Sequence, residues 1–115
     1  MTSTSIVTVN TKSGKCLIEG QEYSVVGFGT AHMKRTPDLC YKAVKAAVDS
    51  GYRIIDTATR YMNFIPISNA LNGYKRHEFY IISKAWHGSQ TSKKWCEDLM
   101  TALQQLKMDD LDAYL

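Results

Sequence analysis

The sequence predicts an α/β fold in which parallel strands alternate with helices. Short apolar runs rich in Ile, Val and Tyr alternate with longer segments whose apolar residues recur every three or four positions. Strands that alternate with helices in this way pair in parallel through right-handed crossovers. The chain has 115 residues, whereas a complete (β/α)8 barrel, or TIM barrel, has about 250. We therefore expect an N-terminal β-hairpin followed by about four β/α units, which is an incomplete barrel or half-barrel.

A β-hairpin is predicted within residues 1–20. Residues 6–9 and 15–18 are short alternating runs, and a polar connector that ends at Gly14 separates them. A strand over residues 23–30 follows and becomes glycine-rich toward its end. Its Gly-Phe-Gly sequence lacks the third glycine of a dinucleotide-binding loop, and no helix begins directly after it. These glycines instead indicate a place where the backbone turns or a ligand approaches closely.

The first predicted helix is marked at both ends. Thr36 is suited to the N-cap, Pro37 to the first helical position and Gly51 to the position past the end. Apolar and small residues recur at helical spacing, so one face of the helix should pack on the sheet. The expected core-facing stripe is Leu39, Ala43, Ala46, Ala47 and Ser50, widened by Val44 and Val48.

The rest of the chain continues the alternation, so that residues 1–115 form one incomplete barrel domain. The run over 79–83 is almost continuously apolar, which is typical of a strand covered on both faces. The expected elements are a strand over 52–56, a short helix from Asn63 or Ile65 to Leu71, a strand over 79–83, a helix capped by Thr91 or Ser92, and a strand over 111–115. The expected core-facing residues of the last helix are Trp95, Leu99, Ala102, Leu103 and Leu106.

Composition limits the class of protein. Apolar residues make up 44% and charged residues 22% of the chain, as in ordinary soluble proteins, and no run approaches the ~18 apolar residues of a membrane span. The net charge of +3 is spread along the sequence, which argues against nucleic acid as a partner. Cys16, Cys40 and Cys96 stand far apart without metal-ligand spacing, so we expect reduced thiols and no metal site. The polar N-terminus lacks the apolar core of a secretory signal, so we expect the protein in the cytoplasm.

A candidate site follows two of the predicted strands. The strand over 52–56 ends in Asp56, Tyr61 follows shortly after, and Lys84 follows the strand over 79–83. Because an unpaired charge at the end of a buried strand is costly to desolvate, we expect the Asp and the Lys to meet. Taken singly, the three residues have simpler alternatives: a capping carboxylate, an ordinary ion pair and a half-buried tyrosine.

Four segments of the chain match a known pattern in register. They are Gly29-Thr30, Gly51-Tyr52-Arg53-Ile54-Ile55-Asp56-Thr57-Ala58 with Tyr61 and Asn63 beyond it, Ser83-Lys84-Ala85-Trp86, and the closing residues 106–115. In this order and spacing they resemble the N-terminal part of an aldo-keto reductase. The resemblance implies a barrel with a hairpin across its bottom, which reduces the carbonyl groups of small-molecule aldehydes and ketones with NADPH.

The resemblance also implies roles for individual residues. Asp56, Tyr61 and Lys84 fall on three members of the family's catalytic tetrad. Tyr61 and Trp86 fall on residues that contact the substrate. The residues implied beside the NADP(H) cofactor are Gly29, Thr30 and Asp56.

The chemistry gives each member of the triad a task. Hydride addition to a carbonyl carbon leaves negative charge on the oxygen, so the reaction needs a proton donor. A free phenol, with a pKa near ~10, is a weak acid at neutral pH. A lysine cation beside the phenol would stabilise the phenolate, and a carboxylate would hold the lysine charged and oriented. Tyr61 is therefore the expected acid, Lys84 its activator and Asp56 the anchor.

The 115 residues depart from the family's pattern in several places. The fourth catalytic residue of the family, a histidine, falls just beyond the position of Leu115, and most cofactor contacts fall in the C-terminal half of the barrel. Ala31 replaces a pocket tryptophan, and residues 64–68 replace an acidic helical segment. We therefore expect this fragment to be inactive alone and to self-associate through its open sheet edges.

Two alternatives to a reductase stay open. One is a non-catalytic half-barrel that binds a partner through its open edge, and the other is a pseudoenzyme that senses a nucleotide without turnover. His32 and His87 each follow a predicted strand end and are weaker candidates for the pocket, whereas we expect His77 in solvent.

Overall fold

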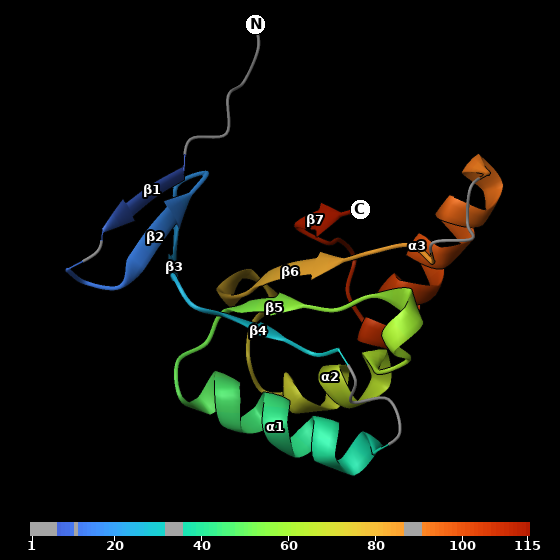
Figure 1. Cartoon of the computed structure of the whole chain (residues 1–115), viewed down its shortest axis with the longest axis horizontal. Helices are drawn as coiled ribbons and strands as arrows, with labels where there is room; N and C mark the ends of the chain where they lie inside the picture. The colour runs from blue at the N-terminus through green and yellow to red at the C-terminus, as the bar shows by residue number, and fades with distance from the viewer. Residues whose placement is uncertain (1–6, 11, 32–35, 87–90) are drawn as a thin grey trace, which may run out of the picture.

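The computed structural model describes residues 7–10, 12–31, 36–86 and 91–115, which form two β-sheets and three α-helices (Figure 1). The N-terminal sheet is antiparallel, with strands β1 (Val7–Asn10), β2 (Lys15–Ile18) and β3 (Gln21–Ser24) in that order. The second sheet is parallel, in the order β4 (Gly27–Gly29), β5 (Ile54–Asp56), β6 (Tyr80–Ser83) and β7 (Ala113–Tyr114). The helices are α1 (Pro37–Asp49), α2 (Phe64–Ala70) and α3 (Ser92–Leu106), and two 3-10 turns are η1 (Thr59–Tyr61) and η2 (Arg76–Glu78).

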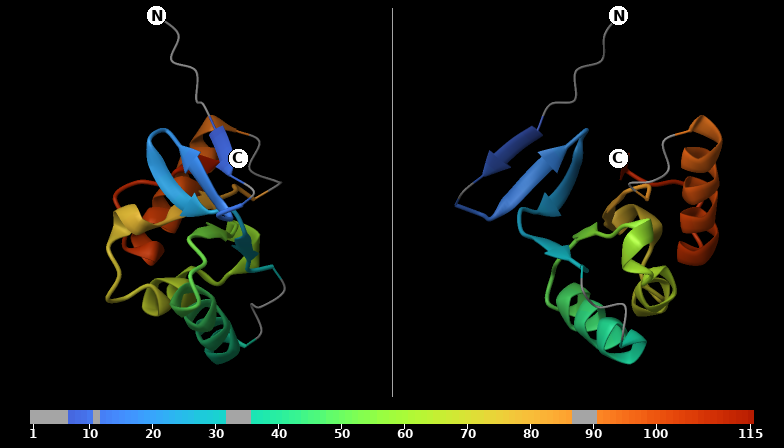
Figure 2. Two further views of the ribbon diagram at one scale, coloured as in Figure 1. Left: turned by 90° about the vertical axis from the view of Figure 1, so that its left-hand side faces the viewer. Right: turned by 45° about the vertical axis from the view of Figure 1, so that its right-hand side comes forward.

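The parallel sheet has the order predicted from the sequence. A helix follows each of β4, β5 and β6 and returns the chain to the next strand in parallel. Figure 1 and Figure 2 show α1 and α2 along one side of the sheet, α3 near β6 and β7, and the antiparallel sheet beside the end at which the parallel strands begin. The predicted fold class, an incomplete (β/α) barrel preceded by a hairpin, is confirmed.

The antiparallel sheet begins with the predicted hairpin. Asn10 Oδ1 accepts the N–H groups of Lys12 (3.0 Å) and Ser13 (3.2 Å), and Gly14 supplies the positive φ of +69° that closes the turn. The single strand predicted over residues 23–30 is wrong, because the chain crosses there from one sheet to the other. Residues 23–24 end β3, residues 25–26 are exposed, and β4 begins at Gly27 in the parallel sheet.

Helix α1 starts and ends as predicted, although its buried face differs. Thr36 holds the N-cap position without a side-chain hydrogen bond, and Gly51 has a φ of +110°. Leu39 is 58% exposed, and Ala46 and Ser50 are also exposed, so this part of the predicted stripe is wrong. The buried residues are spaced as one helical face: Cys40, Val44, Ala47 and Val48.

The parallel sheet is buried on its helix side and half-buried on the other. Ile55 and Ile81 have no exposed surface, whereas the alternate residues Ile54 and Ile82 are half-buried. The prediction of a strand covered on both faces at 79–83 is therefore wrong for the described residues. The core on the helix side consists of Cys40, Val44, Val48, Ile55, Phe64, Ile67, Ala70, Leu71, Phe79, Ile81, Ala102 and Leu106.

Helix α3 is less buried than its periodicity suggests. Thr91 Oγ1 accepts the N–H of Lys94 (3.2 Å), which is the predicted N-cap. Ala102 and Leu106 are buried, but Trp95 is 39% exposed. The Trp95 ring contacts Tyr114 of the outer strand β7 edge-on at 4.8 Å, so the first turns of α3 lie beside the last strand rather than over the sheet.

Two further findings concern the cysteines and the hydropathy of the helices. Cys16 and Cys40 are buried, Cys96 is exposed, and all three are free thiols, as predicted. Within the described ranges, no helix combines the length and the hydropathy that a membrane crossing requires.

Candidate functional site

An ion pair joins two neighbouring strands at the carboxyl end of the parallel sheet. Asp56 is the last residue of β5, and Lys84 directly follows β6. Lys84 Nζ donates to Asp56 Oδ1 (2.5 Å) and to the backbone oxygen of Thr57 (3.1 Å). The two charged side chains are 30% and 38% exposed, so the pair is open to solvent on one side. The two residues meet as expected because carboxyl ends of parallel strands share one edge of the sheet.

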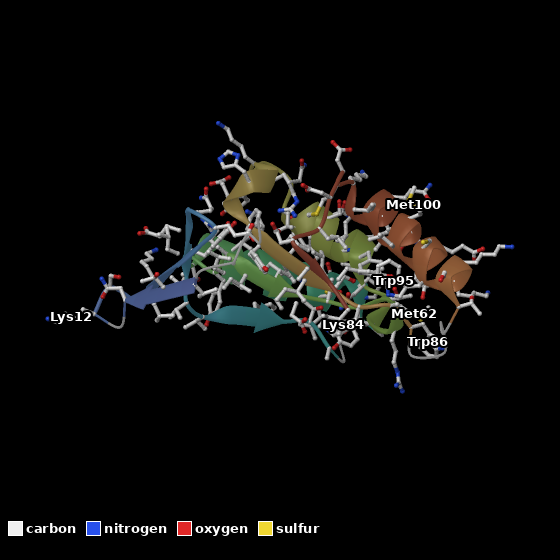
Figure 3. All side chains as sticks on the ribbon, turned by 90° about the horizontal axis from the view of Figure 1, so that it is seen from above. Lys12, Met62, Lys84, Trp86, Trp95 and Met100 are labelled. Atoms are coloured by element: carbon white, nitrogen blue, oxygen red, sulfur yellow. The ribbon has the colours of Figure 1, made fainter. Side chains whose placement is uncertain are left out.

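Tyr61 is brought to this ion pair by the turn η1. Lys84 Nζ lies 5.5 Å from the centroid of the Tyr61 ring. The turn is tied to the end of β6, since the N–H of Thr59 donates to the backbone oxygen of Lys84 (3.0 Å). Met62 follows in the left-handed region, with a φ of +54°, and ends the turn before α2. Figure 3 shows Lys84, Met62 and Trp86 gathered at one end of the molecule.

Gly29 and Thr30 lie at the end of β4, beside Asp56 on β5. Gly29 is in register with Asp56, and a Cβ added to this exposed glycine would meet no atom within 4 Å. Thr30 is fully buried, and both its N–H (3.1 Å) and its hydroxyl (3.0 Å) donate to the backbone oxygen of Asp56. The threonine thus fixes the backbone that carries the carboxylate, and the glycine leaves open space next to it.

A buried polar network beneath the site was not expected from the sequence. Thr57 Oγ1 donates to Asn63 Oδ1 (2.8 Å), and Asn63 Nδ2 donates to the backbone oxygen of Thr30 (2.8 Å). Thr57 and Asn63 are 0% and 1% exposed. The network links the ends of β4 and β5 to the start of α2, and so fixes both ends of the segment that carries Tyr61. The sequence signal was present, because both residues belong to the matched pattern, but no periodicity indicates that they touch.

Trp86 and Arg60 form the outer part of the site. Trp86 is 42% exposed, and its backbone N–H donates to Asp98 Oδ2 (3.0 Å). The guanidinium carbon of Arg60 lies 5.5 Å from the centroid of the Trp86 ring, which is within cation–π range. Sequence reasoning singled out the tryptophan but missed the arginine.

The histidines add nothing to the site in the described residues. His77 is exposed, as expected, and His32 and His87 lie outside the described residues. In the part of the chain that the structure describes, no group of three or more His, Cys, Asp or Glu side chains is placed to hold a metal ion.

A separate groove of about 870 Å³ lies among the three helices. Its walls include Tyr41 on α1, Ile65 and Pro66 on α2, and Thr101 on α3. Asp56, Tyr61 and Lys84 do not line it, but Thr59 and Met62 do, so the groove adjoins the turn that carries Tyr61 without containing the ion pair.

The arrangement brings three ionisable side chains together at a half-exposed position. A carboxylate holds an ammonium group 5.5 Å from the centroid of a phenol ring. Hydrogen bonds to the backbone oxygens of Asp56, Ala58 and Lys84 fix the backbone segments that carry the three side chains.

Known proteins share this sequence and this architecture. The methylglyoxal reductase DkgB of Escherichia coli O157:H7 is 34% identical over 94 residues, which cover 80% of this chain and 35% of that protein. The crystal structure of MGS-M4, an aldo-keto reductase from a Medee basin deep-sea metagenome library, superposes with a TM-score of 0.72 and 35% identity over 83% of this chain and 35% of that one. The Bombyx mori aldo-keto reductase AKR2E4 in complex with NADP superposes with a TM-score of 0.72 and 27% identity, over 84% of this chain and 34% of that one.

The chain spans about a third of the length of the relatives that it matches. The match nevertheless includes the whole candidate site, because the sequence model of the aldo/keto reductase family covers residues 25–115. On this evidence the chain belongs to the aldo/keto reductase family.

Proposed function

We propose that this chain carries the proton-transfer part of an oxidoreductase that reduces aldehydes or ketones with NADPH. The observation that carries the proposal is the Lys84 ammonium, which is held by Asp56 and lies 5.5 Å from the Tyr61 ring centroid at the carboxyl end of a parallel sheet. Barrel enzymes carry their chemistry at this end of the sheet.

Each of the three residues has one role in this proposal. Tyr61 donates a proton to the carbonyl oxygen as negative charge develops there. Lys84 stabilises the phenolate that remains, and Asp56 keeps the lysine charged and directed at the ring. Thr30 positions the backbone of Asp56 through two hydrogen bonds.

In this proposal the nicotinamide of NADP(H) lies beside Gly29 and Asp56, which are in register on neighbouring strands. Gly29 leaves open space beside Asp56, because a Cβ at this position would meet no atom within 4 Å. Gly29 and Asp56 would therefore flank the ring, with Thr30 supporting them from beneath. The cofactor would supply the hydride, and the residues of this chain would supply position and the proton.

The substrate would be a small carbonyl compound that contacts Tyr61 and Trp86. The exposed Trp86 ring offers a flat apolar surface next to Lys84. We also propose a cytoplasmic location, as for a soluble enzyme that draws on the cellular NADPH pool.

The decisive test joins residues 1–115 to the remaining C-terminal part of the Escherichia coli relative and measures NADPH-dependent reduction of methylglyoxal. We expect activity, and we expect Tyr61→Phe to lower kcat by about 10²- to 10⁴-fold, because it removes the general acid. Tyr41→Phe, at an exposed tyrosine of α1, is the matched control and should leave kcat unchanged. A Tyr61→Phe variant with unchanged kcat would refute the proposed role.

The 115-residue chain alone should not reduce aldehydes with NADPH. The matched relatives are about three times as long, and the resemblance assigns most cofactor contacts to the part that this chain does not match. NADPH consumption above the rate without protein would contradict this expectation.

A second candidate function is a binding module, and the edges of the sheet favour it. In the described residues, β4 and β7 each pair on one side only, and the sheet face that carries Ile54 and Ile82 is half-buried. Unpaired parallel edges attract further strands, so the chain should self-associate or bind a relative. Light scattering after size-exclusion chromatography should give a mass above one chain, and a stable monomer would count against this function.

A further inference from the structure

Arg60 is a cation that forms no ion pair within the described residues. No carboxylate of the described residues forms an ion pair with Arg60, and the residues outside the described ranges include no Asp or Glu. Asp98, whose carboxylate accepts the backbone N–H of Trp86, pairs with Arg60 in none of these contacts. Lys84, by contrast, is already neutralised by Asp56. The guanidinium of Arg60 can therefore form an ion pair with an added carboxylate, while Asp98 contributes a negative charge at the same part of the site.

The Trp86 ring lies beside the guanidinium of Arg60. The guanidinium carbon lies 5.5 Å from the ring centroid. A guanidinium has five N–H donors, so contact with an aromatic ring leaves donors for other partners. These donors form the fork that binds a carboxylate through two parallel hydrogen bonds. Arg60 is exposed, so a carboxylate from solution can reach it.

Two contacts between the η1 turn and the segment after β6 place Arg60 relative to Tyr61, the proposed proton donor. Tyr61 faces Lys84, and Arg60 faces Trp86. Lys84 and Trp86 are two residues apart in the chain. A carboxylate on Arg60 would thus lie at a different place from a carbonyl group at Tyr61.

We propose that Arg60, which lies beside the Trp86 ring, binds the carboxylate of an anionic carbonyl substrate whose carbonyl group lies at Tyr61. The substrate class is an aldehyde or ketone that also carries a carboxylate. This proposal rests on the proposed function, because it assigns the carbonyl group to Tyr61. It makes Arg60 a specificity-determining residue that the family resemblance does not supply.

The test compares two ketones that differ in charge and by one methyl group. 4-Acetylbenzoate carries a carboxylate across the ring from its carbonyl group, and its methyl ester is the neutral counterpart. Each is titrated into the full 115-residue chain while NMR follows the side-chain N–H signals of Arg60 and Trp86. We expect the acid to bind about tenfold more tightly than the ester, because the carboxylate gains charge-assisted hydrogen bonds.

Three variants test whether Arg60 causes the tighter binding of the acid. Arg60→Gln should remove it, Arg60→Lys should retain part of it, and Lys12→Gln should leave it unchanged. Lys12 is an exposed cation at the opposite end of the molecule, as Figure 3 shows, and so controls for unspecific attraction of anions. Equal affinities for acid and ester, no saturable binding of the acid, or a preference that survives Arg60→Gln would each overturn the proposal. The titration needs neither cofactor nor turnover, so an inactive Tyr61 site and a missing carboxylate site give different results.

Discussion

The parallel sheet carries an ion pair at each end, and the two pairs are built differently. At the carboxyl end, Lys84 pairs with Asp56, and these side chains are 30% and 38% exposed. At the amino end, Arg76 precedes β6 and pairs with Asp112, which precedes β7, at 2.7 Å and with 26% and 27% exposure. The exposed fractions of the side chains are similar in the two pairs, so burial does not explain how the pairs differ. The difference lies in what else each group binds.

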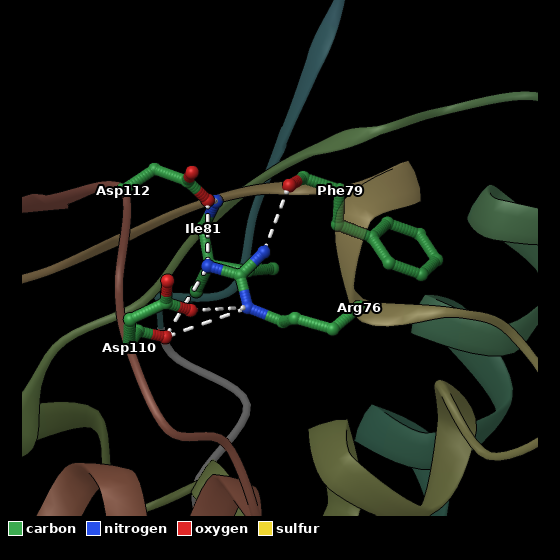
Figure 4. A network of polar contacts seen from close by, with 5 residues as sticks. All are labelled: Arg76, Phe79, Ile81, Asp110 and Asp112. Atoms are coloured by element: carbon green, nitrogen blue, oxygen red, sulfur yellow. Dashed lines mark hydrogen bonds and ion pairs between the residues drawn. The ribbon is translucent and has the colours of Figure 1, made fainter.

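The amino-end pair is fully engaged by the backbone, as Figure 4 shows. Arg76 donates to the backbone oxygens of Phe79 (2.9 Å) and Asp110 (3.2 Å) as well as to the carboxylate of Asp112. The same carboxylate oxygen of Asp112 accepts the N–H of Ile81 (2.7 Å). The pair therefore fastens the start of β6 to the start of β7.

The carboxyl-end pair has fewer hydrogen bonds to the backbone than the amino-end pair. Lys84 has three donors and contacts two oxygen atoms, those of Asp56 and Thr57. Tyr61 lies beside the ammonium group rather than being bound by it. Similar charges thus stabilise one end of the sheet and leave the other end available for chemistry, which matches the division of labour known for barrels.

Breaking the amino-end pair should have the largest effect on stability. Arg76→Met should lower the free energy of unfolding by about 2–3 kcal/mol, because Asp112 loses its partner and two backbone oxygens lose a charged donor. Urea denaturation measures this change. Lys42→Met, which removes an exposed pair with Asp38 (70% and 80% exposed), is the control and should cost less than about 0.5 kcal/mol. Equal losses in the two variants would contradict the structural role of Arg76.

Breaking the carboxyl-end pair should affect function more than stability. Lys84→Met should change the free energy of unfolding by less than about 1 kcal/mol, because Lys84 donates to one backbone oxygen rather than two and the methionine retains much of the apolar stem. In the chain joined to the C-terminal part of the relative, the same change should lower kcat by at least about 10²-fold. Urea denaturation and NADPH consumption measure the two effects. If Lys84→Met destabilises the chain as strongly as Arg76→Met, the comparison fails.

The sequence predicts the order of elements well because strands and helices differ in periodicity, but it does not determine which side of a helix is buried. In α1 the small residues Ala43, Ala46 and Ala47 widen the apolar stripe, so Leu39 and Cys40 compete for the core and only tertiary packing decides. The passage of the chain from one sheet to the other at residues 25–26 cannot be predicted for a related reason. Valines favour strands whether the chain stays in one sheet or passes to another.

The contact between Asp56 and Lys84 is predictable because each residue follows a strand end, and parallel strand ends meet. The contact between Arg60 and Trp86 is not predictable in this way. It depends on the 3-10 turn that carries Arg60 and on the hydrogen bond from Thr59 to Lys84, neither of which leaves a periodic signal. The role of Asn63 is hidden similarly, since a buried amide and a solvated one look alike in a sequence.

A third charged cluster lies on the exposed side of α1, away from the sheet. Its disruption should have the smallest effect on stability of the three. Asp49 binds Lys45 (2.9 Å) and accepts the hydroxyl of Tyr74 (2.5 Å), and the pKa of Asp49 lies below its ordinary value of 3.8, first because of the Tyr74 hydroxyl and then because of Lys45. A lowered carboxyl pKa contributes stability that is present above the ordinary pKa and is lost as the pH falls through the folded value.

Tyr74→Phe should therefore raise the pKa of Asp49 toward 3.8 and weaken the acid dependence of stability that this group causes. NMR titration of the Asp49 side-chain carbonyl carbon measures the shift. Lys45→Gln removes the second cause and should shift the same pKa by less. A larger pKa shift in Lys45→Gln than in Tyr74→Phe would mean that the ammonium group, rather than the hydroxyl, is the main cause of the lowered Asp49 pKa. Asp49 would then depend mainly on a lysine, as Asp56 does on Lys84.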